Sequence, residues 1–141
     1  MTSPKPKAYV LDSWSILAYL EDEPAAAMVA DLIVEAHERR IQLLMSVVNV
    51  GEVWYILARR TSDADADRSV TELHELGIEF RDADWRLVHG AARFKSKHKI
   101  SFADGFAAAL TSQEKDAVLL TGDQAFKSLE REIRVMWLPR A

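Results

Sequence analysis

The sequence predicts an α/β sandwich built around a parallel sheet. Short apolar runs of strand length alternate along the chain with longer segments in which apolar residues recur at helical spacing. Strands that alternate with helices pair in parallel through crossover connections, and helices cover the resulting sheet. The 141 residues, of which 49% are hydrophobic, are enough for one domain with one core. Residues 1–7, where prolines alternate with lysines, are expected to be a flexible segment before a single domain at residues 8–141.

Five apolar runs have the length of buried strands. The first is unbroken and ends at Asp12, and the fourth is followed by Thr121, Gly122 and Asp123. The expected strands cover residues 8–11, 41–45, 78–80, 117–120 and 133–138. Acidic residues therefore stand directly after two of the strands.

Helix start and stop signals separate these strands. Pro24 opens a helix in a position that proline tolerates, and Ser46 is a suitable N-cap for another. Acidic residues at 63, 65 and 67 suit a helix N-terminus, and Gly77 ends that helix. The expected helices begin after Asp12, at Pro24, after Ser46, near Asp63, at Trp85 and at Phe102, and end near Leu20, Arg40, Leu57, Gly77, His98 and Glu114.

Composition limits the function classes and the cellular location. With no cysteine there is no disulfide, thiolate metal site or cysteine nucleophile. The sequence has no apolar run of the ~20 residues that a membrane span needs, and no apolar secretory signal, so we expect a cytoplasmic protein. The net charge of -4 argues mildly against a nucleic-acid binder, unless several of the acids are neutralised together in one divalent-cation site.

Four acidic residues are expected to meet at one edge of the sheet. In open α/β sheets the ligand site lies beyond the carboxyl ends of the strands. Asp12 and Asp123 follow strands there, Glu52 lies in the first turns of the helix after the second strand, and Asp104 lies in the first turn of its own helix. These four residues are the candidate catalytic and metal-binding groups, because like charges gathered together repel each other unless a cation neutralises them.

An all-oxygen ligand set favours Mg²⁺ or Mn²⁺ over zinc. Two such ions ~4 Å apart can activate a water and stabilise the leaving oxygen in phosphodiester hydrolysis. Ser13 and Thr121 offer supporting hydroxyls beside two of the acids.

Each acid also has a purely structural interpretation. Asp12 and Asp123 fit helix N-caps, and Ser101 with Asp104 fits a capping box. Glu52 fits an exposed helix residue. Four unrelated caps at one sheet edge are nevertheless a weaker explanation than one shared site.

Four sequence segments resemble the PIN-domain ribonucleases, and within that family the VapC-type toxins of bacterial toxin–antitoxin pairs. The segments, which occur in the family's order and span most of the chain, are Tyr9-Val10-Leu11-Asp12-Ser13-Trp14, Asn49-Val50-Gly51-Glu52, Ser101-Phe102-Ala103-Asp104 and Leu119-Leu120-Thr121-Gly122-Asp123-Gln124-Ala125-Phe126. Two positions depart from the usual pattern. Gly105 replaces a more common alanine, and Trp14 replaces a small residue.

The resemblance implies both an architecture and an activity. It implies a three-layer α/β/α sandwich with a central, mostly parallel sheet, and an endoribonuclease that cleaves RNA with Mg²⁺ or Mn²⁺ held by Asp12, Glu52, Asp104 and Asp123. It further implies a homodimer that is inhibited by a cognate antitoxin.

The most basic stretch is the other candidate feature. Lys95, Lys97 and Lys99 lead into the Ser101 turn and are candidate RNA-binding residues, although cations at a helix end also complement the helix dipole. The four tryptophans are expected in the core or an interface, and the four histidines show no metal-ligand spacing.

Two alternative functions remain open. Phosphotransfer receivers and haloacid-type phosphatases also place an aspartate after the first strand, but Ser13, Trp14 and the Thr121-Gly122-Asp123 segment do not match their further requirements. An inactive PIN scaffold that only binds RNA or a protein is the alternative from a different class. Because all four acids are present, the sequence gives no sign of lost chemistry.

Overall fold

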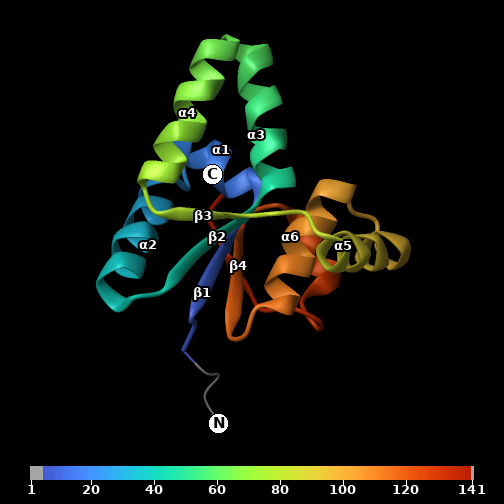
Figure 1. The fold of residues 1–141 in the computed structure, drawn as a ribbon. Helices are drawn as coiled ribbons and strands as arrows, with labels where there is room; N and C mark the ends of the chain where they lie inside the picture. Colours follow the sequence, from blue (N-terminus) through green and yellow to red (C-terminus); the bar gives the residue numbers. More distant parts are fainter. Residues whose placement is uncertain (1–4, 141) are drawn as a thin grey trace.

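A computed structural model describes residues 5–140, which form a five-stranded sheet with helices on both faces (Figure 1). The strands are β1 (Ala8–Leu11), β2 (Gln42–Ser46), β3 (Ile78–Arg81), β4 (Ala117–Thr121) and β5 (Val135–Trp137). The helices are α1 (Ser13–Leu20), α2 (Ala26–Arg39), α3 (Val47–Arg60), α4 (Asp63–Glu75), α5 (Trp85–Lys97) and α6 (Phe102–Gln113), with a 3₁₀ helix η1 (Gln124–Leu129). The expected α/β/α sandwich is confirmed.

All four strand pairings are parallel, in the order β3-β2-β1-β4-β5. β1 lies at the centre, with Val10 in register with Leu44 of β2 and with Leu119 of β4. The carboxyl ends of β1 and β4 are therefore neighbours, and the residues that follow these strands emerge side by side.

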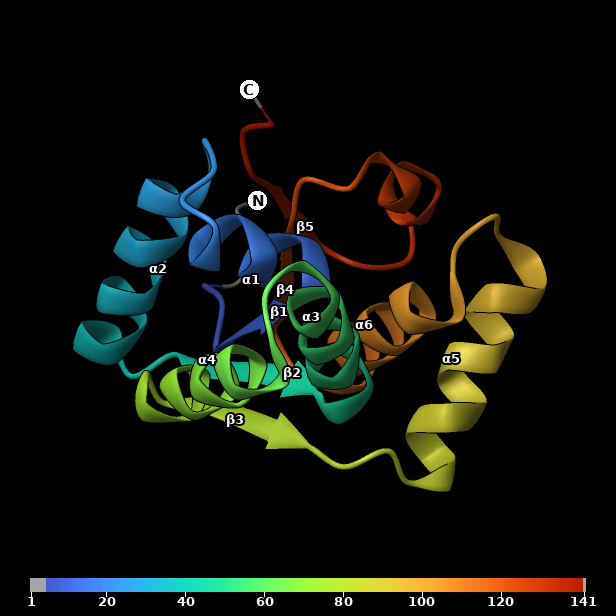
Figure 2. The same ribbon diagram turned by 90° about the horizontal axis from the view of Figure 1, so that it is seen from above.

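Side chains of the central strands alternate between two separate cores. Tyr9 and Leu11 of β1 belong to the core that packs against α1, α2, α3 and α4. Ala8 and Val10 belong to the core that packs against α5, α6 and η1. Figure 2 shows α2 and α5 on opposite sides of the sheet. Because both faces of β1 are buried, this strand is apolar at every position.

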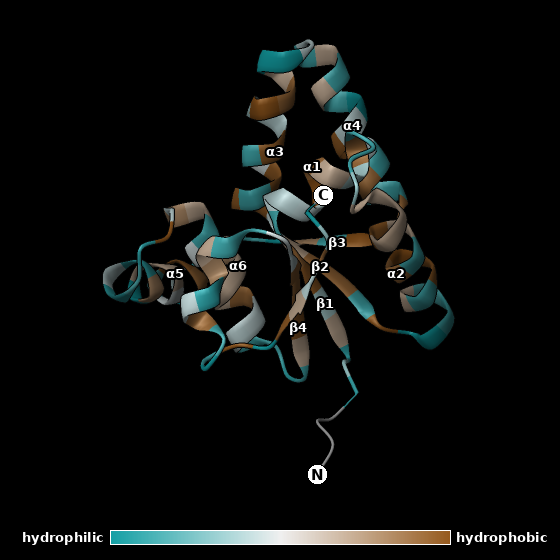
Figure 3. Ribbon diagram, turned by 180° about the vertical axis from the view of Figure 1, so that it is seen from behind, coloured by the Kyte–Doolittle hydropathy of each residue, from teal (hydrophilic) through white to brown (hydrophobic). Residues whose placement is uncertain are grey.

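α3 and α4 pack against each other as a helical pair that extends beyond the sheet (Figures 1 and 3). Hydrophilic and hydrophobic residues are interspersed along both helices (Figure 3). Trp54 of α3 donates a hydrogen bond from Nε1 to Asp67 Oδ1 of α4 at 2.8 Å, which joins the two helices.

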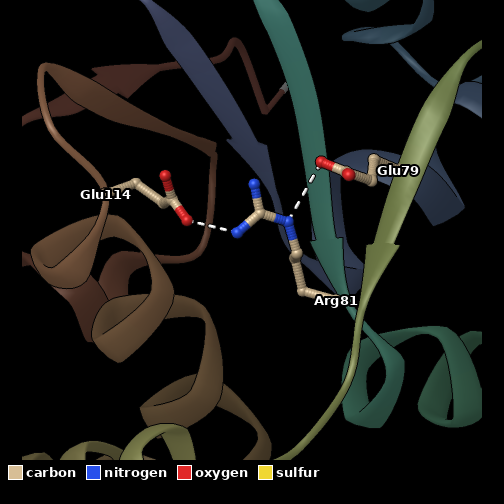
Figure 4. Close-up of polar contacts among 3 residues, drawn as sticks. All are labelled: Glu79, Arg81 and Glu114. Carbon is tan, nitrogen blue, oxygen red and sulfur yellow. Dashed lines mark hydrogen bonds and ion pairs between the residues drawn. The ribbon is translucent and has the colours of Figure 1, made fainter.

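The edge strand β3 is fastened to the opposite helical layer by Arg81 (Figure 4). Its Nε donates to Glu79 Oε2 at 3.0 Å, and its guanidinium also pairs with Glu114, which caps the C-terminus of α6. The three side chains come from β3 and the end of α6, so this network ties the sheet edge to the α5–α6 layer.

Most expected element boundaries agree with the structure to within two residues. The end of α3 is an exception, because the helix continues to Arg60, three residues beyond Leu57. Pro24 does not open α2, which begins at Ala26 after its N-cap, Ala25. The sequence interpretation also missed η1, whose six residues are too few to establish a helical period. Residues 1–4 of the expected flexible segment lie outside the described residues, whereas Lys7 already exchanges backbone hydrogen bonds with Asp116 and Gln42.

Within residues 5–140, no helix is both long and apolar enough to span a membrane.

Gly105 marks a place where the backbones of α5 and α6 approach closely. A Cβ atom added there would lie 2.7 Å from the backbone oxygen of Ala91. This contact explains why glycine stands at a helical position where alanine would ordinarily be more stable. The two helices could accept a methyl group only by moving apart.

We therefore expect Gly105→Ala to lower the free energy of unfolding by about 1–3 kcal/mol, because the added methyl overpacks the interface. The matched control is Gly51→Ala in α3, where an added Cβ meets no atom within 4 Å. That change should raise the stability by up to ~1 kcal/mol through helix propensity alone. Urea denaturation of both variants measures the difference. An equal gain in stability from both changes would contradict the close approach.

Candidate active site

The four candidate acids lie on four elements whose ends meet at the carboxyl edge of the sheet. Asp12 joins β1 to α1, Glu52 lies in α3, Asp104 lies in the first turn of α6, and Asp123 joins β4 to η1. Asp12 is buried, whereas the other three side chains are partly exposed.

Asp12 is fixed by hydrogen bonds to both of its carboxylate oxygens. Oδ1 accepts from the backbone N–H of Ser15 at 2.8 Å, which completes a capping box at the start of α1. Oδ2 accepts from the Thr121 hydroxyl at 2.5 Å. The side chain is only 1% exposed, so these two contacts determine its orientation.

Thr121 also links Asp12 to Asp123. Its Oγ1 accepts from the backbone N–H of Asp123 at 3.0 Å while its hydroxyl donates to Asp12. Asp123 Oδ1 in turn accepts from the backbone N–H of Ala125 at 2.9 Å and caps η1. One hydroxyl therefore holds the turn after β4 against the turn after β1.

Glu52 is oriented by the other supporting hydroxyl. Ser13, which directly follows Asp12, donates from Oγ to Glu52 Oε1. The Ser13 hydroxyl is thus directed at the acid of a neighbouring element and not at Asp12. The first residue of α1 connects the β1 turn to α3.

Asn49 joins the fourth element to this group, and sequence reasoning had given it no role. Its Nδ2 donates to the backbone oxygen of Ala103 at 3.0 Å, directly before Asp104. Asn49 is fully buried, and its Oδ1 has no hydrogen-bond partner among the described residues. The available signal was spacing, because Asn49 precedes Glu52 by three residues and so lies on the same face of α3.

Burial and mutual repulsion raise the pKa of two of the acids. Desolvation raises the pKa of Asp12 to about 7, against the opposing effect of its hydrogen bonds, and the charge of Asp104 adds to the increase. Desolvation also raises the pKa of Asp104 to about 6, with contributions from the charges of Asp123 and Glu52. Asp104 thus interacts electrostatically with all three other acids: the charges of Asp123 and Glu52 raise its pKa, and its own charge raises the pKa of Asp12.

The donor set has the chemistry of a divalent-cation site. It consists of carboxylate oxygens, with the unpartnered Asn49 Oδ1 on the same helical face as Glu52, and such oxygens suit Mg²⁺ or Mn²⁺. Within residues 5–140, however, no group of three or more acidic or histidine side chains stands in position to hold one metal ion. The acids therefore interact electrostatically in this arrangement without forming a coordination shell.

Trp14 packs over the turn between Thr121 and Asp123. A Cβ atom added to Gly122 would overlap Cη2 of the indole ring, so the ring rests directly on the glycine backbone. Trp14 is partly buried against the core. The bulky residue at this position is thus accommodated by a glycine within the candidate site.

The three candidate RNA-binding lysines have different surroundings. Lys95 donates from Nζ to the backbone oxygen of Ile100 at 2.7 Å and stabilises the turn after α5. Lys97 lines a cavity between α5 and α6. Lys97 and Lys99 are both exposed. Of the four tryptophans expected in the core or an interface, Trp85 lies outside the core, because its side chain is 73% exposed in this chain.

A comparison with protein families identifies the family of this chain. Residues 9–132, most of the chain, match the family model of the PIN domain. The chain belongs to the PIN domain family. A comparison with curated protein sequences gave no significant match.

Solved structures share this PIN fold at low sequence identity. VapBC2 from Rickettsia felis, bound to a DNA fragment from its promoter, is 13% identical, with a TM-score of 0.71 over 94% of this chain and 99% of that chain. VapC20 from Mycobacterium tuberculosis, a toxin that cleaves the sarcin–ricin loop, is 16% identical, with a TM-score of 0.66 over 86% and 94%. VapBC-1 from nontypeable Haemophilus influenzae is 16% identical, with a TM-score of 0.67 over 92% and 97%.

The pKa of Asp12 predicts a pH-dependent stability of the metal-free protein. Between pH 3.8 and about 7, the unfolded chain releases this proton while the folded protein retains it. Because the folded state then binds more protons, its free energy of unfolding falls as the pH rises. The total contribution is on the order of 4 kcal/mol at ~1.4 kcal/mol per pKa unit.

Denaturation in the presence of a chelator, repeated across this pH range, measures the effect. Asp12→Asn keeps the capping acceptor but cannot titrate, so its stability should decline less steeply than that of the wild type. Parallel pH profiles for the two proteins would show that Asp12 ionises at its ordinary pKa.

Proposed function

We propose that this PIN domain is a Mg²⁺- or Mn²⁺-dependent endoribonuclease that hydrolyses RNA phosphodiester bonds at Asp12, Glu52, Asp104 and Asp123. The observation that carries the proposal is the position of these acids on elements whose ends meet at the carboxyl edge of the sheet, where burial and the nearby acids raise the pKa of Asp12 and Asp104. Such an arrangement is unfavourable for folding alone, and carboxylates with perturbed pKa values mark functional sites.

The protein's own groups have distinct roles in this proposal. The four carboxylates would hold Mg²⁺ or Mn²⁺, which when bound lowers the pKa of a water and stabilises charge on the leaving oxygen. Thr121 keeps Asp12 in one orientation, and Ser13 does the same for Glu52. Asn49 holds the backbone directly before Asp104. These contacts restrict the orientations of Asp12 and Glu52 before a metal ion binds.

We further propose that this ribonuclease is the toxin of a toxin–antitoxin pair, acting on cytoplasmic RNA. Support comes from the solved structures with the same fold, which include VapBC complexes and the RNA-cleaving toxin VapC20. A cognate antitoxin would then be the partner that controls the activity. An arginine supplied by that partner would pair with the acids in bidentate fashion and compete with the metal ion.

The competing hypothesis is an inactive PIN scaffold that only binds RNA or a protein. One observation favours this hypothesis. Within the described residues, no three of the acids are placed to coordinate one metal ion. For the protein to act as a nuclease, metal binding would have to draw the partly exposed side chains of Glu52, Asp104 and Asp123 together. Cleavage assays with and without the metal distinguish the two hypotheses directly.

Asp12→Asn and Asp104→Asn should each abolish metal-dependent RNA cleavage while the protein remains folded. We expect losses beyond the ~10- to 100-fold that changes in outer-shell residues produce, because a direct ligand is removed. Each substitution also removes a repelling charge, so the melting temperature of the metal-free protein should not fall and is expected to rise. Single-turnover cleavage and thermal denaturation measure the two effects.

Asp31→Asn is the matched control, because Asp31 is exposed on α2 and distant in sequence from the four acids. It should retain wild-type cleavage. If either active-site variant cleaved RNA at the wild-type rate, the assigned roles would be wrong. A wild-type protein without cleavage in Mg²⁺ or Mn²⁺ would favour the inactive scaffold.

The protein should form a homodimer, and a co-encoded antitoxin should block its cleavage of RNA. The sequence also predicts an apolar dimer surface on the early helices, around Ile16, Leu20, Met28 and Leu32. The structure corrects this prediction in part, because Ile16 and Leu32 are core residues and only Leu20 and Met28 are partly exposed. Sedimentation at micromolar concentration tests the dimer, and monomers alone would contradict it. Undiminished cleavage in the presence of the co-encoded partner would contradict the inhibition.

A further inference from the structure

A line of basic side chains runs along one face of α5. Arg86, His89, Arg93 and Lys97 follow one another at intervals of three, four and four residues, which places them on one side of a helix. All four line a cavity of about 430 Å³ between α5 and α6. The α6 side of this cavity is formed by uncharged residues, namely Ala109, Ser112 and Gln113. We call this feature the α5 groove.

The groove has a strong excess of positive charge. Within residues 5–140, Arg86, Arg93 and Lys97 form no ion pair with any acidic residue. The one carboxylate in the lining, Glu132, already pairs with His98 at 2.7 Å. Three permanent cations therefore face the cavity without partners, in a chain whose net charge is -4.

An aromatic side chain lies at the far end of the same helix. Trp85 is 73% exposed, and its ring lies 5.5 Å from that of His89 between centroids. Among residues 5–140, Trp85 belongs to neither of the two hydrophobic cores. Exposed aromatic rings beside cations are the surface that single-stranded nucleic acids use, with bases stacking on the ring and phosphates on the cations.

One end of the groove, at Lys97, lies near the start of α6, whereas its lining on α6 comes from the C-terminal half of that helix. Lys97 is the last residue of α5 and is separated by three residues from Ser101, which caps the helix bearing Asp104. The contact of Ala91 with Gly105 fixes α5 against the first turns of α6. From Arg86 to Lys97 the cations extend over roughly 16 Å at 1.5 Å per residue, long enough to contact more than one phosphate.

We infer that the α5 groove binds the sugar–phosphate backbone of the RNA substrate on one side of the scissile bond, through Arg86, Arg93 and Lys97. The inference rests on the proposed ribonuclease function and gives that site its substrate path. It also revises the expectation from sequence. Of the three lysines in the basic stretch, Lys97 belongs to the groove, whereas Lys95 stabilises the turn after α5.

The test compares two triple variants that change the net charge equally. The first carries Arg86→Gln, Arg93→Gln and Lys97→Gln, because glutamine preserves helix propensity. The control carries Lys5→Gln, Arg59→Gln and Lys115→Gln, three exposed cations outside α5. Binding of a labelled, mixed-sequence single-stranded RNA is measured by fluorescence anisotropy in EDTA, where metal-dependent cleavage cannot occur, over a range of salt concentrations.

We expect the groove variant to bind more weakly and to show a shallower salt dependence. The slope of log K against log salt should fall by about 0.7 for each lost phosphate contact, or about 2 for three. The control variant should keep the wild-type slope. Quenching of tryptophan fluorescence by RNA should also decrease in Trp85→Phe.

Equal slopes for the groove variant, the control and the wild type would overturn the inference. So would a groove variant that binds RNA normally but escapes a protein inhibitor, since the groove would then bind a protein partner. Wild-type cleavage in Mn²⁺ is measured separately on the same RNA. If the wild type cleaves RNA but the groove variant keeps the wild-type salt slope, only the role of the groove is rejected. If the slope of the groove variant changes but the wild type does not cleave, the nuclease function is rejected and RNA binding by the groove remains.

Discussion

The hydrogen bond between Thr121 and Asp12 is the contact on which the candidate site depends. It joins the turns after β1 and β4, which are neighbours only because the sheet order places these strands side by side. The bond also holds a carboxylate that is 1% exposed, with its pKa raised to about 7 by burial. Ser13, Asn49 and Glu52 extend the same arrangement to α3 and to the start of α6. The site is thus a set of strand and helix ends connected through polar side chains and backbone groups.

The capping and functional interpretations of the acids are compatible. Asp12 and Asp123 both cap the helices that follow them, as a purely structural explanation requires. A cap uses one carboxylate oxygen, which leaves the other free for a second task. In Asp12 that second oxygen meets Thr121. Capping therefore positions an acid at the carboxyl edge of the sheet. Capping alone does not explain the raised pKa of Asp12 and Asp104.

The sequence was sufficient to predict the strands and most helices, because burial on both faces makes β1 apolar at every position and β4 apolar at all positions but Thr121. It was insufficient wherever the answer depends on contacts between elements. The glycine at position 105 departs from the family pattern, and only the contact with the backbone oxygen of Ala91 explains it. Sequence reasoning assigned Asn49 no role, because its hydrogen bond to the backbone oxygen of Ala103 joins residues 54 positions apart. The basic stretch pointed to consecutive lysines, whereas a helix groups residues three and four apart and so unites Lys97 with Arg93, His89 and Arg86.

An acidic chain that handles a polyanion needs its charges separated in space. The acids at the carboxyl edge repel RNA phosphates unless cations neutralise them, so the attraction has to come from another surface. The α5 groove offers such a surface on the layer that carries Asp104, and the close approach of α5 to α6 at Gly105 holds the two at a fixed separation. The same glycine that would weaken an isolated helix therefore sets the position of the basic face relative to the acids. Packing between α5 and α6 would in this way hold the cations that bind phosphates at a fixed distance from the carboxylates, without any basic residue entering the acid cluster itself.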